Sequence, residues 1–170
     1  LWDPASAKEA FIKAMGAARA SGRKVALSLS DSFCVDRHRD EFLDLLEHHV
    51  DILFANEQEI ISLYQAASFD AAIQAVRGHC EIAALTRSEK GAVIVAGDEV
   101  HVIDAEAVAR VVDTTGAGDL YASGFLAGLT AGRGLPECGR MAGIAAAEII
   151  SHMGARPEVD LTALIKEKLG

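Results

Sequence analysis

The feature of this sequence that most restricts its fold is the alternation of short apolar runs with segments of helical spacing. The run at 25–29 has the length of a buried strand, whereas the apolar spacing in 37–49 marks one face of a helix. Strands that alternate with helices predict an α/β layered domain with a largely parallel sheet. The predicted strands are 25–29, 51–54, 82–85, 92–95, 100–103 and 108–112. The predicted helices are 4–20, 37–49, 57–64, 69–77, 119–131, 136–151 and 161–169.

Composition and charge restrict the class of function. The 170 residues include 16 Lys and Arg against 25 Asp and Glu, a formal net charge of −9. This acidic balance disfavours a nucleic-acid partner, which would require a basic surface. Backbone amides can still bind a phosphate without any net positive charge. A hydrophobic fraction of 51% is that of a globular domain with one core.

The cysteines and the hydropathy of the sequence indicate the cellular compartment in which the protein is expected. Cys34, Cys80 and Cys138 are far apart and form no Cys-x-x-Cys pair, which favours a reducing compartment and hence the cytoplasm. The uncharged stretch 120–132 is shorter than the roughly 20 apolar residues that a membrane-spanning helix needs. We therefore expect neither a disulfide framework nor a membrane partner.

One segment carries the pattern of a reactive site. Residues 113–119, Asp-Thr-Thr-Gly-Ala-Gly-Asp, stand between an extended run and an apolar helix. Gly116 and Gly118 leave room for a close backbone approach, and amides at a helix N-terminus attract anions. Asp119 could accept a proton from an attacking hydroxyl while those amides stabilise a transferring phosphoryl group. The spacing alone leaves open that Asp119 only stabilises the helix dipole.

The segment 113–119 and the residues 120–125 that follow it resemble the second signature of the ribokinase (PfkB) family of carbohydrate and nucleoside kinases. Residues 56–59 look like the Asn-x-x-Glu element of that family, and 86–91 look like its nucleotide-contacting turn. Residues 151–155 resemble its closing segment. The resemblance covers nearly the whole chain and implies a ribokinase-like layered α/β/α domain with a mostly parallel sheet.

The resemblance also implies roles for single residues. Asp119 would be the catalytic base, and the amides of Gly116, Ala117 and Gly118 would form the anion hole for the γ-phosphoryl group. Mg²⁺ would be placed by Asn56 and Glu59, through water. The implied ATP contacts are Asn56, Thr86, Arg87, Ser88, Glu89, Lys90, Gly91, Gly118 and Gly143. The positions that match a monovalent cation (K⁺) site are Asp113, the carbonyls of Thr115 and Ile149, and Gly154.

Three sequence features can be explained by the fold alone, without a role in binding or catalysis. Glu59 could lie on a solvated face of the helix 57–64, and residues 86–91 could form a plain hairpin turn. The pair Gly124 and Gly128 on the helix after Asp119 is expected to permit tight packing of that helix on the sheet.

Family members are about twice as long as this chain, and their N-terminal half carries the acceptor pocket, the lid and a first glycine signature. We therefore expect residues 1–170 to be the C-terminal, nucleotide-binding half of a single ribokinase-like domain that lacks its N-terminal half and lid. A homodimer would form through that missing lid. The acceptor cannot be identified from the residues present.

The activity implied is ATP-dependent phosphorylation of a hydroxyl group on a nucleoside or a small sugar. Residues 1–4 and 29–39 resemble the adenosine-kinase-like branch, so adenosine is the first expectation. A sugar kinase of the ribose or fructose type is the alternative substrate class. A non-catalytic nucleotide-binding regulatory domain of the same fold is the alternative function. Asp119 weighs against the latter, because a domain that only binds could keep the glycines and lose the base.

Overall fold

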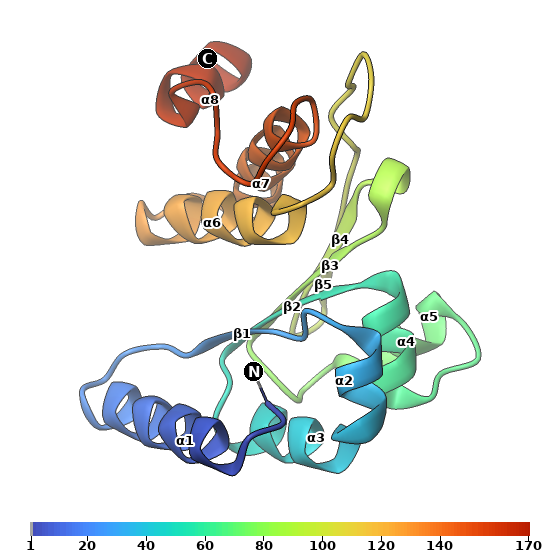
Figure 1. Ribbon diagram of the computed structural model, residues 1–170, viewed down its shortest axis with the longest axis vertical. Helices are drawn as coiled ribbons and strands as arrows, with labels where there is room; N and C mark the ends of the chain where they lie inside the picture. The colour runs from blue at the N-terminus through green and yellow to red at the C-terminus, as the bar shows by residue number, and fades with distance from the viewer. Residues whose placement is uncertain (1) are drawn as a thin grey trace. The chain divides into compact units, whose positions relative to one another are not determined.

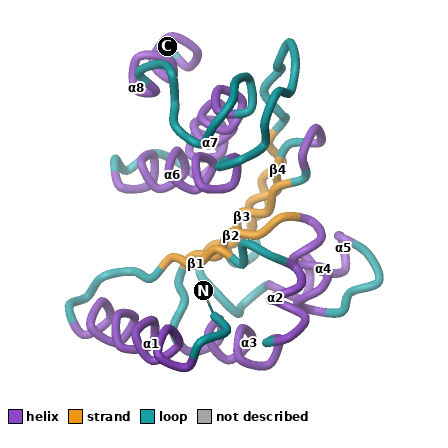
Figure 2. The backbone as a smooth tube through the Cα atoms, in the orientation of Figure 1, coloured by secondary structure: helices purple, strands orange, loops and turns teal. Residues whose placement is uncertain are grey.

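The computed structural model describes residues 2–170. The chain forms two compact units, shown with their elements in Figures 1 and 2. Unit 1 comprises Leu1–Thr86 and Val95–Val100, and unit 2 comprises Arg87–Ile94 and His101–Gly170.

Five strands make one sheet in the order β1-β2-β3-β4-β5. The first three pair in parallel, with Ile52 of β2 opposite both Ala26 and Ile82. β4 and β5 are joined by the two-residue turn Gly97–Asp98, as in a β-hairpin. The strands are β1 (Ala26–Ser28), β2 (Ile52–Asn56), β3 (Ile82–Thr86), β4 (Ala92–Ala96) and β5 (Glu99–Ile103).

The core of unit 1 explains why its strands appear as unbroken apolar runs. Residues 52–55 and 82–85 are all buried, so neither strand alternates between apolar and polar side chains. In Figure 1 the helices of unit 1 lie on one side of β1 to β3. These helices are α1 (Ala5–Ala20), α2 (Ser32–Arg37), α3 (Arg39–His48), α4 (Glu57–Tyr64) and α5 (Phe69–Val76).

The short helix α2 was not predicted. It has six residues, of which only Val35 is buried, so it shows no helical period that a pattern search could find. Its start is fixed locally, because the Asp31 side chain accepts a hydrogen bond from the N–H of Phe33 at 2.8 Å.

Unit 2 is built on a helix pair in which glycines permit close contact. A Cβ at Gly124 would lie 2.8 Å from the carbonyl oxygen of Met141, and one at Gly128 would lie 3.0 Å from Sγ of Cys138. These glycines therefore pack α6 on α7, and the prediction that they pack a helix on the sheet was wrong. The helices of unit 2 are the 3₁₀ helix η1 (Ser88–Lys90), α6 (Ala117–Thr130), α7 (Leu135–Ile149) and α8 (Leu161–Leu169).

The predicted strand at 108–112 is also wrong. Among the described residues, 104–114 contain no strand, and Val111 and Val112 are exposed. The N–H of Val112 donates to the carbonyl of Ile150 at 2.8 Å, which is a single contact and not a ladder. A β-branched run forms a strand only where a neighbouring strand is available to pair with it.

Candidate active site

The glycine loop 113–119 places Gly116 at the N-cap of α6 with φ +82°. An L-residue rarely adopts this conformation, and a Cβ at Gly116 would lie 3.0 Å from the Cβ of Ala155. Gly118 differs, since a Cβ built there meets no atom within 4 Å. The first glycine is therefore required by the fold, whereas the second leaves open space beside the helix start.

Three amides at the start of α6 remain without an acceptor in the described part of unit 2: those of Gly116, Gly118 and Asp119. The N–H of Ala117, in contrast, donates to the carbonyl of Thr114 at 3.1 Å. Unpaired N–H groups at the positive end of a helix dipole form an anion site. Of the three amides predicted for the anion hole, those of Gly116 and Gly118 are thus open, and that of Ala117 is engaged in a turn.

Asp119 is the third residue of α6 and is exposed. Within the described residues of unit 2 its carboxylate makes no hydrogen bond or ion pair. A carboxylate in this state is able to accept a proton from a bound hydroxyl.

Asp113 anchors the glycine loop to the segment that follows α7. Its Oδ1 accepts from the N–H of Thr115 at 2.9 Å and from Oγ1 of Thr115 at 2.7 Å, and its Oδ2 accepts from the N–H of Gly154 at 2.9 Å. These hydrogen bonds, that of Gly154 first, lower the pKa of Asp113. A carboxylate offers about four lone-pair sites, so little capacity remains for a cation.

The structure therefore gathers most of the residues predicted for a K⁺ site. Asp113, Thr115 and Gly154 are joined by hydrogen bonds, and Ile149 ends α7 next to Ile150, whose carbonyl binds Val112. The carbonyls of Thr115, Ile149 and Gly154 are the oxygens that remain for such an ion, while the Asp113 side chain holds the loop. The K⁺ site itself stays a prediction.

A second polar group at the end of α7 was missed from the sequence. Oε1 of Glu148 accepts from the N–H of Glu158 at 2.9 Å and lies 3.1 Å from Nε2 of His152. Burial opposes the charged form of His152, but the Met153 carbonyl and the two carboxylates outweigh it and raise its pKa. The sequence holds this pair as Glu-x-x-x-His, but His152 lies beyond the end of α7, so the spacing alone does not reveal the contact.

In unit 1, Asn56 and Glu59 form the capping box of α4. Oδ1 of Asn56 accepts from the N–H of Glu59 at 2.9 Å, and Oε2 of Glu59 accepts from the N–H of Asn56 at 2.9 Å. Nδ2 of Asn56 donates to the other carboxylate oxygen at 2.8 Å. Glu59 is only 6% exposed, and burial raises its pKa. The alternative that Glu59 lies on a solvated face is therefore wrong.

The Asn-x-x-Glu spacing is itself a sequence signature of a capping box, and this signal was overlooked. It bears on the predicted role in metal binding. Both carboxylate oxygens of Glu59 already accept hydrogen bonds, so direct coordination of Mg²⁺ would compete with the cap. A contact through water leaves the cap intact, and this is the form in which the residues fit the ion.

The remaining predicted ATP contacts fall at strand ends and in turns. Thr86 ends β3 and is the register partner of Asn56, so the carboxyl ends of β2 and β3 bring these two residues side by side. In unit 2, the N–H of Arg87 donates to the carbonyl of Gly91 at 2.8 Å and closes a turn that contains η1. The turn is thus more elaborate than a plain hairpin.

Gly91 and Gly143 have close neighbours within unit 2. Gly91 has φ +80°, and a Cβ there would overlap the carbonyl of Ile103 and lie 2.8 Å from the N atom of Ala105. Gly143 lies within α7, where a Cβ would be 3.7 Å from Cγ of Glu106. The glycine at 91 is therefore demanded by chain packing, whether or not a nucleotide binds beside it.

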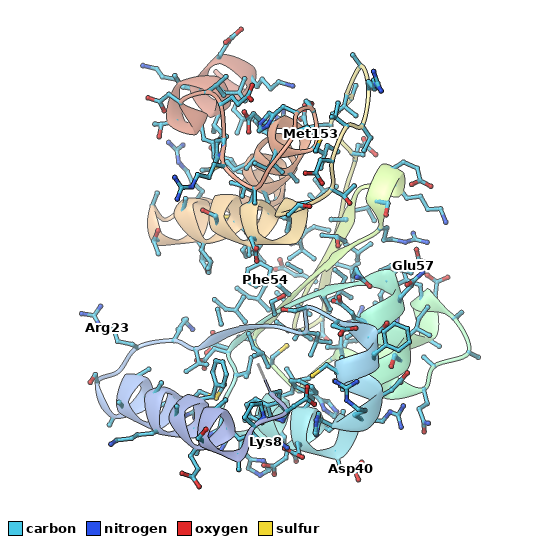
Figure 3. All side chains as sticks on the ribbon, viewed as in Figure 1. Lys8, Arg23, Asp40, Phe54, Glu57 and Met153 are labelled. Atoms are coloured by element: carbon cyan, nitrogen blue, oxygen red, sulfur yellow. The ribbon has the colours of Figure 1, made fainter. Side chains whose placement is uncertain are left out.

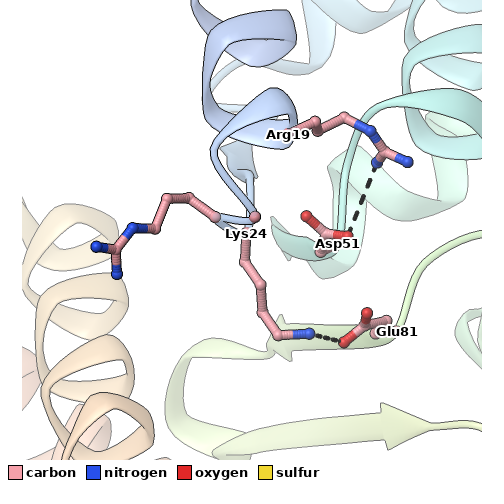
Figure 4. A pocket seen from close by; sticks show the side chains of 6 residues that line it. Arg19, Lys24, Asp51 and Glu81 are labelled. Atoms are coloured by element: carbon pink, nitrogen blue, oxygen red, sulfur yellow. Dashed lines mark hydrogen bonds and ion pairs between the residues drawn. The ribbon is translucent and has the colours of Figure 1, made fainter.

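Unit 1 also has an open pocket at the opposite ends of its strands (Figure 4). Lys24 pairs with Glu81, and Arg19 lies 3.8 Å from Asp51. Lys24, Asp51 and Glu81 precede β1, β2 and β3. The pocket therefore lies at the N-terminal ends of these strands, away from Asn56 at the C-terminal end of β2. The charged side chains named here pair with one another, so they do not require a ligand. No predicted site residue lines this pocket.

Residues 2–170 contain neither a membrane-spanning helix nor a cluster of metal-binding side chains. None of the helices there has the length and apolar character needed to cross a bilayer. No group of three or more His, Cys, Asp or Glu side chains in this part of the chain is arranged to hold a metal ion.

Comparison with known proteins places this geometry in a family. The family model described as pfkB family carbohydrate kinase matches residues 2–161. The chain belongs to the pfkB carbohydrate kinase family, as the motifs at 56–59, 86–91 and 113–119 predicted.

Solved structures agree with this assignment. A probable sugar kinase from Rhizobium etli is 50% identical with a TM-score of 0.96, over 99% of this chain and 51% of that one. Adenosine kinase from Sinorhizobium meliloti is 48% identical with a TM-score of 0.96, over 99% of this chain and 52% of that one. Ribokinase from Arabidopsis thaliana, solved with ribose and ATP, is 25% identical with a TM-score of 0.73, over 89% and 49% of the two chains. The predicted ribokinase-like α/β fold is confirmed.

Among curated proteins, a cytidine kinase from Thermococcus kodakarensis is 30% identical over 141 residues, which are 80% of this chain and 50% of that protein. The chain spans about half the length of the curated relatives and solved structures that it matches first.

Proposed function

We propose that this chain is the nucleotide-binding half of an ATP-dependent kinase that phosphorylates a hydroxyl group of a nucleoside, with adenosine as the first candidate. One observation carries the proposal: the first turn of α6 presents three open amides and the unpaired carboxylate of Asp119 together. Phosphoryl transfer needs charge stabilisation and a proton acceptor at one place. Similarity to an adenosine kinase and a cytidine kinase supports the nucleoside class.

In the proposed reaction, the open amides of Gly116, Gly118 and Asp119 stabilise the charge on the transferring phosphoryl group. The carboxylate of Asp119 takes the proton of the acceptor hydroxyl as its oxygen attacks phosphorus. ATP lies along Thr86, the turn 87–91 and Gly143.

Mg²⁺, when bound, neutralises phosphate charge, and Asn56 with Glu59 would place it through water. K⁺ would lie among the carbonyls of Thr115, Ile149 and Gly154, with Asp113 as the anchor of the loop. A homodimer and a cytoplasmic location belong to the same proposal. The latter is supported by the three free cysteines.

A sugar is the second candidate acceptor, and the 50% identity to a probable sugar kinase favours it. A non-catalytic regulatory domain would have no use for an exposed, unpaired carboxylate beside the anion site. The state of Asp119 therefore argues against that function.

The test is Mg²⁺-dependent phosphate transfer from ATP by the natural protein that carries this chain. The acceptors are adenosine, other nucleosides, ribose and fructose, and ATP binding is measured separately by calorimetry. We expect the highest kcat/KM with adenosine. Preference for ribose or fructose would establish the sugar kinase. ATP binding with no transfer to any acceptor would overturn the kinase proposal.

A further inference from the structure

We infer that Glu148 and His152 are positioning residues for the glycine loop 113–119, which they hold through the segment that follows α7. The inference rests on the proposed function for its catalytic consequence, but its structural part stands without it. All of the residues involved belong to unit 2.

The first step is the closure of the segment 151–158 on the end of α7. One carboxylate oxygen of Glu148 receives both the N–H of Glu158, at 2.9 Å, and Nε2 of His152, at 3.1 Å. The side chains of Glu148 and His152 are 8% and 14% exposed. Met153 between these contacts lies at the surface (Figure 3). The segment is therefore held by Glu148 and not by an apolar core of its own.

The second step is the contact between this segment and the glycine loop. The N–H of Gly154 donates to Oδ2 of Asp113 at 2.9 Å, and Ala155 fills the space that a side chain at Gly116 would occupy. Both contacts come from residues enclosed between His152 and Glu158. Release of Glu148 would free the backbone that fixes the loop at its first residue, Asp113, and at its central residue, Gly116.

The third step links this support to chemistry. The polar contacts of Glu148 go to His152 and Glu158, so Glu148 acts on the loop indirectly. The amides of Gly116 and Gly118 must nevertheless point at one phosphoryl group, and a displacement of about 1 Å in such a site can cost about 10²-fold in rate. Glu148 and His152 thus keep these amides oriented toward the phosphoryl group without contacting the substrate.

The experiment compares Glu148→Ala with Glu148→Gln in the natural protein. Gln keeps an oxygen that can accept both hydrogen bonds, so it should restore the wild-type behaviour. Glu137→Ala is the matched control, because Glu137 is on the same helix and pairs with Arg133 at 3.1 Å in the same i, i+4 manner. His152→Ala removes one of the two contacts of Glu148. It replaces Glu148→Ala as the test variant if Glu148→Ala does not fold.

The first readout is amide hydrogen exchange at Thr115, Ala117 and Gly154, whose N–H groups are hydrogen-bonded, and it needs no activity. Glu148→Ala should speed exchange there by at least about tenfold, the factor expected when a hydrogen bond to a charged group is lost. His152→Ala should have a smaller effect of the same sign, and Glu148→Gln and Glu137→Ala should have none. Equal exchange in Glu148→Ala and Glu137→Ala, or in His152→Ala and wild type where Glu148→Ala does not fold, would overturn the inference.

The second readout is the kinetics of phosphate transfer. Glu148→Ala should raise KM for ATP and lower kcat, whereas Glu148→Gln should show wild-type values for both. Faster exchange with unchanged kinetics would overturn the catalytic part of the inference. If the wild-type protein transfers no phosphate, the proposed function fails while the exchange result still decides whether Glu148 holds the loop.

Discussion

The two helix starts at 56–59 and 116–119 place an acidic residue at the same position and use it in opposite ways. Glu59 and Asp119 are each the third residue of a helix, α4 and α6. Asn56 caps α4 with its side chain, which takes the N–H of Glu59, and Glu59 returns the contact. Gly116 caps α6 and has no side chain, so the N–H and the carboxylate of Asp119 both stay open.

The difference shows how one local change separates a scaffold from a reactive site. A side-chain cap accepts hydrogen bonds from the N–H groups at a helix start, which stabilises the helix and leaves those groups unable to bind a ligand. A glycine cap leaves those donors unpaired, which costs stability unless a ligand takes them. The sequence encodes this choice in the cap residue and not in the acidic residue that both helices share.

The largest expected effect concerns the open carboxylate. Asp119→Asn should reduce turnover by about 10²-fold or more, the range of a lost general base. ATP affinity and the thermal midpoint should stay close to wild type, because Asp119 is exposed and unpaired within its unit. Turnover and calorimetric ATP binding are the measurements. Asp70→Asn, at an exposed first-turn aspartate of α5, is the control. Turnover near the wild-type value would remove Asp119 from the role of base.

The next effect concerns the open amides. Gly118→Val should weaken ATP binding by about tenfold or more, because its side chain would enter the space where a phosphate meets the helix start. The fold should tolerate it, since a Cβ at Gly118 meets no atom within 4 Å.

Gly116→Ala should behave in the opposite way and lower stability by about 1–2 kcal/mol, the cost of a left-handed conformation for an L-residue. ATP dissociation constants and thermal midpoints of both variants make the comparison. Unchanged ATP affinity in Gly118→Val would show that the anion site lies elsewhere.

A smaller effect is expected at the closed helix start. Asn56→Ala should lower the free energy of unfolding by about 1–2 kcal/mol, since it removes the cap and leaves buried Glu59 with fewer donors. Ser68→Ala removes the cap of α5, whose hydroxyl accepts from the N–H of Ala71 at 3.1 Å, without exposing a buried acid to the same loss. Urea unfolding of both variants measures the difference. A larger loss in Ser68→Ala than in Asn56→Ala would contradict the role given to Glu59.

The smallest effect is a pH dependence of stability. Burial raises the pKa of Glu59 above the ordinary value of 4.5, so the folded state keeps this proton to a higher pH than the unfolded state does. The contribution of Glu59 to stability is therefore fully present below 4.5 and is lost as the pH rises through the folded pKa. Glu59→Gln should abolish this decline in urea unfolding measured from about pH 4 to about pH 7. Parallel curves for wild type and Glu59→Gln would show that the pKa of Glu59 is not raised.

Much of the fold could be predicted because its elements carry their own signals. Helices α4 and α8 match their predicted bounds, since a cap residue precedes each apolar period. The segment 108–112 shows the limit of such patterns, because apolar β-branched residues do not reveal whether a partner strand exists. Helix α2 is too short to have a period.

The candidate active site likewise has parts that could be predicted from the sequence and parts that could not. The glycine loop could be predicted because its residue types and its cap are adjacent in the chain. The contacts of Glu148 with His152 and Glu158 could not, because they depend on how residues 151–158 turn back on α7. The occupied amide of Ala117 was likewise beyond the sequence, since it depends on the turn that Thr114 adopts.

The glycine contact between α6 and α7 gives this protein a built-in chemical reporter. Cys138 is fully buried beneath Gly128, and burial raises the pKa of its thiol, so a thiol reagent reaches it only when the two helices separate. The rate of labelling at Cys138 therefore counts such separations directly, without an introduced probe. The glycine loop at the start of α6 and Glu148 near the end of α7 both lie at the other end of this helix pair, so the labelling rate reports separations of the pair that supports them both.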